Sequence, residues 1–230
     1  MKRVGLLGGS FNPAHRGHRR ISLAAIEALG LDEEWWLVSP GNPLKSANDM
    51  APFDSRLASA RRMARRAPIK ASDFEKRAGT RFTIDTLAAL LRRYPRHRFV
   101  WLMGSDTVPQ FHRWKAWRGI ARTVPIAVIS RPGYDGGARA ARAMGWLRAF
   151  VRPSSQARKW TEWSAPAILL LRLPPDPTSA TAFRALNPDW HRSSQLRSSS
   201  LAERRPSAAG KRSSTTPSSD RSPLARSSSR

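Results

Sequence analysis

The hydrophobic positions of the chain form short continuous runs that alternate with segments of helical spacing. Five apolar runs of strand length predict buried β-strands at residues 3–7, 34–40, 98–104, 125–130 and 167–173. Apolar residues recur at helical spacing in five further segments, 18–30, 54–66, 83–94, 137–150 and 179–186. Strands that alternate with helices form right-handed βαβ units. The pattern therefore predicts an α/β protein with a Rossmann-like parallel sheet and helices on both faces.

Three residues predict where helices begin and end. Gly30 follows the last apolar position of segment 18–30, so we expect it just past the C-terminus of that helix. Asp54 and Thr83 precede the next two periodic segments, and each is a candidate N-cap residue.

The composition changes abruptly near residue 191. Residues 191–230 contain 14 serines, no aromatic residue and few apolar ones, with nine Lys/Arg against two Asp/Glu. Such a segment cannot bury enough apolar surface to offset its chain entropy. We therefore predict a folded α/β domain at 1–190 and a disordered Ser/Arg-rich tail at 191–230. A shifted reading frame near the end of the gene is one interpretation of this tail.

Composition also limits the classes of function. The chain has 41 Lys/Arg against 16 Asp/Glu, a formal charge of +25, and residues 1–190 are basic without the tail. A basic surface attracts either RNA or phosphorylated small molecules. The absence of cysteine excludes disulfides and thiolate chemistry. No apolar run reaches the roughly 18 residues of a membrane span, and the short apolar start reads as a strand, so we expect a cytoplasmic protein.

The most informative motif is GGSFNPAHRGH, residues 8–18, directly after the first predicted strand. Ligands of open α/β sheets bind beyond the carboxyl ends of the strands. Gly8 and Gly9 let backbone approach a ligand, and the following helix points its N–H groups and positive dipole end at it. His15 and His18 lie three residues apart, so they share one helix face. Imidazoles placed there can donate hydrogen bonds to phosphate oxygens.

Other interpretations of this segment are weaker. The dinucleotide fingerprint G-x-G-x-x-G and the phosphate loop G-x-x-x-x-G-K-[ST] are both absent from this first turn. Taken alone, the two histidines are compatible with surface residues or with half of a metal site. The remaining three histidines lie in unrelated contexts, which disfavours metal binding.

The motif resembles the GGSFxPxHxGH signature of the HxGH nucleotidylyltransferases, and later motifs resemble the nicotinate-nucleotide adenylyltransferase family. These later motifs are NPLK with Lys45, RFTIDTL with Thr83, WLMGSD with Asp106, FHRW with Trp114 and SRPG with Arg131. The last family motif is matched in TSATAFR by Ser179, Thr181 and Arg184, and departed from at Ala180 and Phe183. The resemblance spans most of residues 3–190 and implies the nucleotidylyltransferase form of the Rossmann-like fold.

The resemblance implies a specific reaction. The 5′-phosphate of nicotinate mononucleotide attacks the α-phosphorus of ATP, which gives nicotinate adenine dinucleotide and pyrophosphate without a covalent intermediate. Mg²⁺ would accompany ATP as a phosphate-bound ion rather than sit in an all-protein cage. The sequence leaves the oligomeric state open, and we expect nucleic acid to bind only non-specifically through the tail.

The resemblance also implies roles for individual residues. His15 and His18 would act on the phosphates during catalysis. The residues implied at the ATP phosphates are Gly8, Gly9, Ser10, Phe11, Lys45, Ser179, Thr181 and Arg184. The residues implied at the acceptor nucleotide are Thr83, Asp106, Trp114 and Arg131.

Several of these residues also allow structural interpretations. Trp114 could be ordinary core, Asp106 or Thr83 only an N-cap, Lys45 a solvated side chain, and Arg184 a surface ion-pair partner. Two other functions stay open at this stage: an adenylyltransferase with a different phosphate acceptor, and a basic RNA-binding protein. The chain contains no RNA-stacking aromatic motif that would favour the latter.

Overall fold

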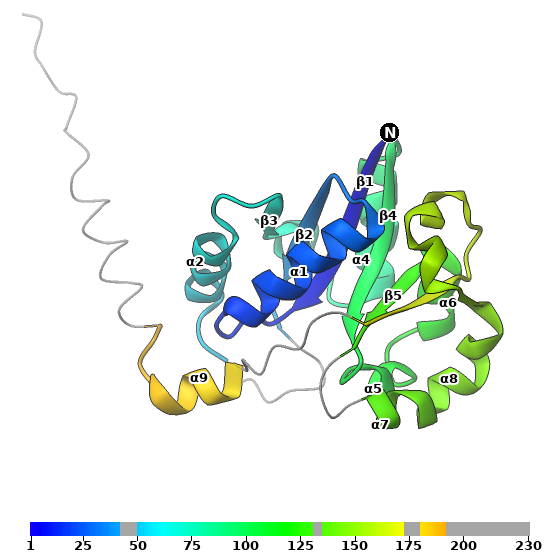
Figure 1. Cartoon of the computed structure of the whole chain (residues 1–230). Coiled ribbons are helices and arrows are strands. Elements are labelled where there is room, and N and C mark those ends of the chain that lie inside the picture. The colour runs from blue at the N-terminus through cyan, green and yellow to red at the C-terminus, as the bar shows by residue number, and fades with distance from the viewer. Residues whose placement is uncertain (42–49, 131–134, 173–179, 192–230) are drawn as a thin grey trace, which may run out of the picture.

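The computed structural model describes residues 1–41, 50–130, 135–172 and 180–191. These residues form a seven-stranded sheet in the order β3-β2-β1-β4-β5-β7-β6, in which every neighbouring pair is parallel (Figure 1). The strands are β1 (Lys2–Gly9), β2 (Glu33–Val38), β3 (Ile69–Ser72), β4 (His97–Gly104), β5 (Ile126–Ile129), β6 (Val151–Arg152) and β7 (Ile168–Leu171). The predicted fold class is confirmed, and β3 and β6 are strands that the hydrophobic pattern did not predict.

Helices cover both faces of the sheet. On the face turned toward the viewer in Figure 1 lie α1 (Arg16–Leu29) and, packed on the same core, α2 (Phe53–Ala64) and the 3₁₀ segment η3 (Ser154–Glu162). On the other face lie α3 (Phe74–Ala78), α4 (Thr83–Arg93), α5 (Val108–Phe111), α6 (Trp117–Thr123), α7 (Asp135–Ala140) and α8 (Arg142–Leu147). The short helix α9 (Ala180–Leu186) lies below α2 in Figure 1, at the end of the molecule opposite the N-terminus, where α5 also lies.

Two hydrophobic cores result, one on each face of the sheet. Successive side chains of a strand point to opposite faces, so Trp35 packs in the core under α4 while Trp36 packs in the core under α1. Every residue of β2 is buried. A strand buried on both faces reads as a continuous apolar run, which is why the central strands were predictable from the sequence.

Helix ends follow the predictions in one case and correct them in two. Gly30 adopts the left-handed conformation (φ 61°) directly after α1, as predicted. The N-cap prediction for Asp54 is wrong, because Pro52 is the cap and Asp54 lies in the first turn of α2, where its charge faces the positive helix end. The N-cap prediction for Thr83 is also wrong, because Phe82 holds the extended cap conformation and Thr83 is the first helical residue of α4.

Segment 137–150 was predicted as one helix, and the structure divides it. The chain is extended at Ala141 (φ −60°, ψ 140°), which separates α7 from α8, and a 3₁₀ turn (Arg148–Phe150) follows. The break allows Ala138 and Leu147 to pack in the same core from two differently directed helices. The predicted late helix at 179–186 is confirmed as α9.

Two predictions concern the organisation of the chain: a C-terminal tail and the lack of a membrane span. The tail is predicted at residues 191–230, of which 192–230 lie outside the described residues, so this division of the chain stays a prediction. Among the described residues, no helix has both the length and the apolar character needed to cross a bilayer.

Candidate active site

The turn between β1 and α1 is fixed by an aromatic residue. Phe11 has a positive φ of 46°, which is unfavourable for a bulky side chain, and its ring is 1% exposed. The ring stacks on Trp36 with centroids 5.0 Å apart and lies 5.0 Å from the ring of His18. Aromatic packing from the core below therefore holds a backbone conformation that the turn requires.

The two motif histidines lie together at the N-terminus of α1. His15 is the N-cap residue and His18 the third helical residue, and their ring centroids are 3.9 Å apart. The predicted shared face is confirmed. The backbone N–H of His15 donates a hydrogen bond to Nδ1 of His18 at 3.2 Å. Because Nδ1 accepts this bond, the neutral ring of His18 carries its proton on Nε2, which makes Nε2 its hydrogen-bond donor.

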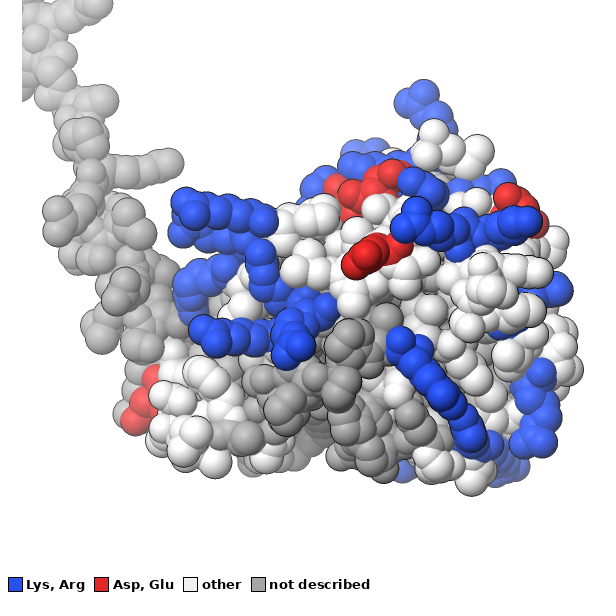
Figure 2. Space-filling model, in the orientation of Figure 1, with Lys and Arg blue, Asp and Glu red and all other residues white. Residues whose placement is uncertain are grey.

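The electrostatics of this turn favour an anion. The N-terminus of a helix carries a partial positive charge on its unsatisfied N–H groups. The first turn of α1 contains no acidic residue that would neutralise this charge. On the face shown in Figure 2, Lys and Arg predominate over Asp and Glu, which agrees with the basic composition of the chain. A phosphate group is the kind of ligand that this combination binds.

The glycines of the motif have a packing reason that the sequence did not reveal. A Cβ atom on Gly8 would lie 2.7 Å from the indole of Trp101, and one on Gly9 would lie 3.3 Å from the ring of Phe11. A side chain at Gly8 would therefore push the indole of Trp101, in β4, away from β1. Backbone access for a ligand, the role expected for both glycines, is a separate property and stays a prediction.

Arg184 joins the last helix to the first turn. Its Nη1 donates a hydrogen bond to the carbonyl of Asn12 at 2.7 Å, and its Nη2 lies 3.4 Å from Oγ1 of Thr181. Of the described residues, Arg184 thus contacts main chain and a hydroxyl, and no ion pair is formed that would make it a surface pair partner. The structure brings Thr181 and Arg184 to the histidine turn across more than 160 residues of sequence.

Other contacts support the same turn and were not predicted. Oγ of Ser59 accepts the backbone N–H of Ala14 at 2.9 Å, and Oδ1 of Asn12 accepts the backbone N–H of Ala51 at 3.2 Å. The buried Arg56 donates to a carbonyl of the turn as well. The basic, amphipathic sequence of α2 gives no sign that two of its residues, Arg56 and Ser59, form hydrogen bonds to the first turn.

The predicted acceptor residues lie at the same sheet edge but on separate elements. Thr83 begins α4, and Asp106 follows β4 in the turn before α5. Thr107 is the cap of α5, so the interpretation of Asp106 as its N-cap is wrong. Trp114 is half-buried after α5, with its ring edge-on to Phe111 at 5.4 Å and to Trp101 at 6.2 Å.

Trp101 therefore lies between the two halves of the site. Its indole packs under Gly8 in β1 and against Trp114 on the acceptor side. Trp101 is the first residue of the motif WLMGSD, but that motif predicted a role only for Asp106, because a buried tryptophan in a strand is typical of an ordinary core. Three predicted site residues, Lys45, Arg131 and Ser179, lie outside the described residues.

Two buried carboxyl groups lie in the protein core near these residues. Burial raises the pKa of Glu34 to about 7, although Ser22 and Trp36 donate hydrogen bonds to it. Burial likewise raises the pKa of Glu75 to about 7, and Oγ1 of Thr86 donates to it at 3.1 Å. Neither group reaches the histidine turn through a hydrogen bond of the described residues, so we assign neither to the chemistry.

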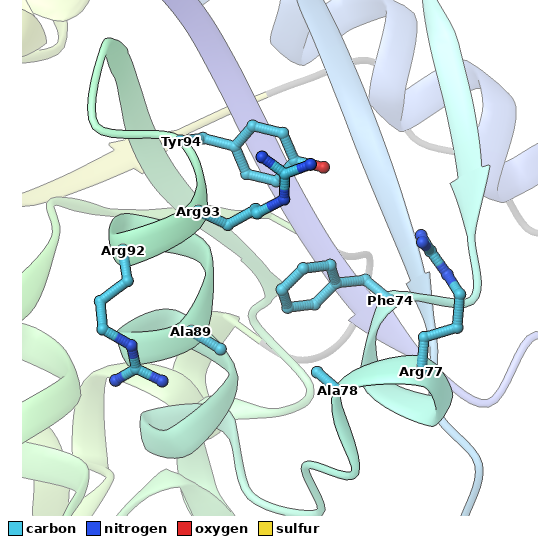
Figure 3. A pocket seen from close by; sticks show the side chains of 7 residues that line it. All are labelled: Phe74, Arg77, Ala78, Ala89, Arg92, Arg93 and Tyr94. Carbon is cyan, nitrogen blue, oxygen red and sulfur yellow. The ribbon is translucent and has the colours of Figure 1, made fainter.

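A separate hollow lies beside α3 and the C-terminal end of α4 (Figure 3). Its volume is about 460 Å³, and it is lined by Phe74, Arg77, Ala78, Ala89, Arg92, Arg93 and Tyr94. None of these residues was predicted as part of the site. Among the described residues, no group of three or more His, Cys, Asp or Glu side chains is arranged to hold a metal ion.

Comparison with known proteins identifies the class first. A family model described as cytidylyltransferase-like matches residues 6–198, so the fold and the histidine turn are those of a cytidylyltransferase-like protein. A probable nicotinate-nucleotide adenylyltransferase of Erythrobacter litoralis is 61% identical over 82% of this chain and 86% of its own length. A second, from Parvibaculum lavamentivorans, is 53% identical over 79% and 90%. The chain belongs to the nicotinate-nucleotide adenylyltransferase family.

Solved structures agree on the fold. The nicotinic acid mononucleotide adenylyltransferase of Plasmodium falciparum, in complex with NaAD, superimposes with a TM-score of 0.59 at 17% identity. The same protein in complex with APC gives a TM-score of 0.58 at 16% identity. Each comparison covers 80% of this chain and 83% of the other. The predicted resemblance to the family is thus confirmed by the relatives, and the solved structures confirm the fold.

Proposed function

We propose that this chain transfers the adenylyl group of ATP to the 5′-phosphate of nicotinate mononucleotide. A phosphate oxygen of the mononucleotide forms a bond to the α-phosphorus of ATP, and the bond from that phosphorus to pyrophosphate breaks. The products are nicotinate adenine dinucleotide and pyrophosphate. The observation that carries the proposal is the pair of adjacent histidines at the N-terminus of α1, with ring centroids 3.9 Å apart, directly beyond the carboxyl end of β1.

The ATP phosphates bind at the β1–α1 turn. The helix N-terminus and the backbone of residues 8–11 provide N–H donors, and His15 and His18 add imidazole donors. His18 is the residue that we assign to the transition state, because its Nε2 is the donor and its ring orientation is fixed through Nδ1. Thr181 and Arg184 approach from α9 and hold the β- and γ-phosphates, with Lys45 and Ser179 as further phosphate ligands.

The acceptor binds on the side of Trp114. The exposed part of this ring stacks on the pyridine, and Asp106 accepts hydrogen bonds from ribose hydroxyls. Thr83 and Arg131 hold the nicotinate end. A carboxylate on the pyridine needs donors, and a basic protein attracts it, so we expect nicotinate mononucleotide to be preferred over its amide.

The chemistry requires positioning and charge stabilisation rather than a covalent adenylyl-enzyme. Mg²⁺ enters as part of the substrate MgATP, bound through phosphates and water. The family relationship and the fold support this role for ATP, and we further propose that the protein acts in the cytoplasm. Nucleic acid is at most a non-specific partner of the basic segment from 191 onward.

Pyrophosphate release tests the proposal. The purified chain is incubated with ATP, Mg²⁺ and, one at a time, nicotinate mononucleotide, nicotinamide mononucleotide and 4′-phosphopantetheine. We expect the nicotinate compound to give the highest kcat/KM, with nicotinate adenine dinucleotide as the product by mass spectrometry. Higher kcat/KM for another acceptor would replace the assigned substrate. Binding to RNA without turnover of any acceptor would favour a nucleic-acid-binding protein instead.

A further inference from the structure

Arg56 is a buried cation in α2 that contacts main chain almost exclusively. Its side chain is 1% exposed, and its pKa is lowered by burial. The guanidinium donates four hydrogen bonds to carbonyl oxygens: Nε to Ala51 at 2.9 Å, Nη1 to Ser10 at 2.8 Å and Ser39 at 2.7 Å, and Nη2 to Pro40 at 3.3 Å.

Among the described residues, Arg56 forms no ion pair with an acidic side chain. Within this part of the chain, its charge is balanced by carbonyl dipoles and by the ring of Phe53, whose centroid lies 5.4 Å from Cζ. An arginine stays protonated in proteins, and burial of its charge without a counter-ion destabilises the folded chain. Such a group is retained where its hydrogen bonds or its positive charge have an effect that an apolar side chain cannot provide.

The four carbonyls belong to three segments that meet at the site. Ser10 lies in the β1–α1 turn, Ser39 and Pro40 follow β2, and Ala51 lies two residues before α2. Strand pairing already joins the ends of β1 and β2, where the N–H of Ser39 donates to the carbonyl of Gly9 at 2.9 Å. Arg56 extends this connection beyond the last residues of both strands, into the turn that leads to the histidines.

We propose that Arg56 is a positioning residue for adenylyl transfer: its guanidinium sets the β1–α1 turn against the end of β2 and fixes a positive charge behind the phosphate-binding backbone. It acts through the carbonyl of Ser10 and touches no substrate. This proposal rests on the proposed function. A planar guanidinium with five N–H donors reaches carbonyls in several directions at once, whereas a lysine ammonium is a compact point charge on a flexible stem.

The test compares Arg56 with Arg19, a matched control. Nη1 of Arg19 donates to the carbonyls of Met63 and Arg65, both at 2.8 Å, so it also binds main chain, but at the C-terminal end of α2. We expect Arg56→Lys to lower kcat about tenfold and to weaken ATP binding about tenfold, since small misplacements of a binding turn have effects of this size or larger. KM for the acceptor changes less than about twofold, and Arg19→Lys leaves all three quantities near those of the parent.

Chemical rescue separates positioning from general stability. In Arg56→Ala, added ethylguanidinium at millimolar concentration should restore activity several-fold, and ethylammonium should not, because only the former has the planar set of donors. ATP affinity is measured by calorimetry without acceptor. If the parent chain binds ATP but releases no pyrophosphate, the proposed function is contradicted. The positioning role of Arg56 is then still tested by comparing the ATP affinities of Arg56→Lys and Arg19→Lys.

Three results would overturn the positioning role. One is an Arg56→Lys chain with the kcat and ATP affinity of the parent. Another is an equal loss of both quantities in Arg19→Lys. The third is failure of both Arg56 variants to fold, with no recovery of activity in ethylguanidinium, because an arginine needed only for folding then accounts for the contacts.

Discussion

The two halves of the candidate site are built in different ways. The proposed ATP half is centred on one continuous segment, residues 8–18, to which α9 adds Thr181 and Arg184. An aromatic ring below this segment and Arg56 of α2 beside it hold its backbone. The proposed acceptor half takes Thr83, Asp106 and Trp114 from three separate elements, and Trp114 packs edge-on against Phe111 and Trp101. The half that performs the chemistry is thus defined locally, and the half that selects the acceptor is defined by the sheet topology.

This difference predicts how the halves respond to substitution. Changes in the ATP half should lower kcat or ATP affinity for every acceptor, because each contact serves the same phosphates. Changes in the acceptor half should raise KM for one substrate and leave ATP binding intact. The following variants test that division.

The largest effect is expected at His18. We expect His18→Ala to lower kcat about 100-fold or more, because removing one donor aimed at a transition-state oxyanion has an effect of this size. His18→Gln restores an acceptor for the His15 N–H without the imidazole, so it should be equally slow. His97→Ala, at the opposite sheet edge, is the control and should keep kcat. Near-parental turnover of His18→Ala in a steady-state assay would remove this residue from the mechanism.

Arg184 should show the next largest effect. Arg184→Ala removes a cation and its bond to the Asn12 carbonyl, so we expect KM for ATP to rise about tenfold or more. Arg158→Ala is a matched control, because Arg158 also donates to a main-chain carbonyl, that of Glu27, away from the turn. A rise in KM for the acceptor with unchanged KM for ATP would move Arg184 to the other half of the site.

Trp114 tests the acceptor half. In Trp114→Ala the pyridine loses its stacking surface, and we expect KM for nicotinate mononucleotide to rise several-fold to about tenfold while ATP binding is kept. Trp117→Ala is the control, because Trp117 also packs edge-on against Phe111. Equal effects of the two substitutions on Tm, with acceptor KM unchanged in both, would show that Trp114 is ordinary core.

Glu75, which is hydrogen-bonded to α4, makes the free energy of unfolding depend on pH. Its pKa of about 7 lies above the value of 4.5 expected in the unfolded chain, so the native state binds the proton more tightly. Its contribution is therefore fully present below about pH 4.5 and is lost as pH rises toward 7, by up to about 3 kcal/mol. We expect Glu75→Gln to be more stable than the parent at pH 8 and similar at pH 5, measured by urea unfolding. An identical pH dependence in both proteins would contradict the assignment.

The smallest effect is expected from removing the C-terminal segment. A chain that ends at His191 should keep its Tm and its activity and lose low-salt affinity for nucleic acid, because the composition of residues 192–230 cannot form a core. Both forms are compared at low and physiological salt. Unfolding or loss of most activity in the shortened chain would show that the division at 191 is misplaced.

The sequence predicted the ATP half better than the rest for a physical reason. The histidine spacing and the helix N-terminus are local properties, so the pairing of His15 with His18 follows from the spacing between the N-cap and the third helical residue. Trp101 and Arg56 could not be found in this way. Their roles depend on which strand and which loop lie beside them, and neither the apolar run of β4 nor the arginine-rich pattern of α2 contains that information.

The helix boundaries show the same limit. Gly30 was predictable because its left-handed conformation is favourable for glycine at any helix end. The single helix expected at 137–150 was divided at Ala141, where burial against the core outweighs the helix propensity of an alanine-rich segment. Local propensity therefore predicts elements until tertiary packing favours a different backbone.

The stereochemical course at the α-phosphorus tests the central claim most directly. That claim is that the turn positions ATP and acceptor for direct attack and that no side chain receives the adenylyl group. The chain is supplied with one diastereomer of ATPαS and nicotinate mononucleotide, and the configuration of the phosphorothioate product is determined. A single in-line displacement gives inversion, which we predict. Retention would require two displacements through an adenylyl-enzyme and would contradict the account.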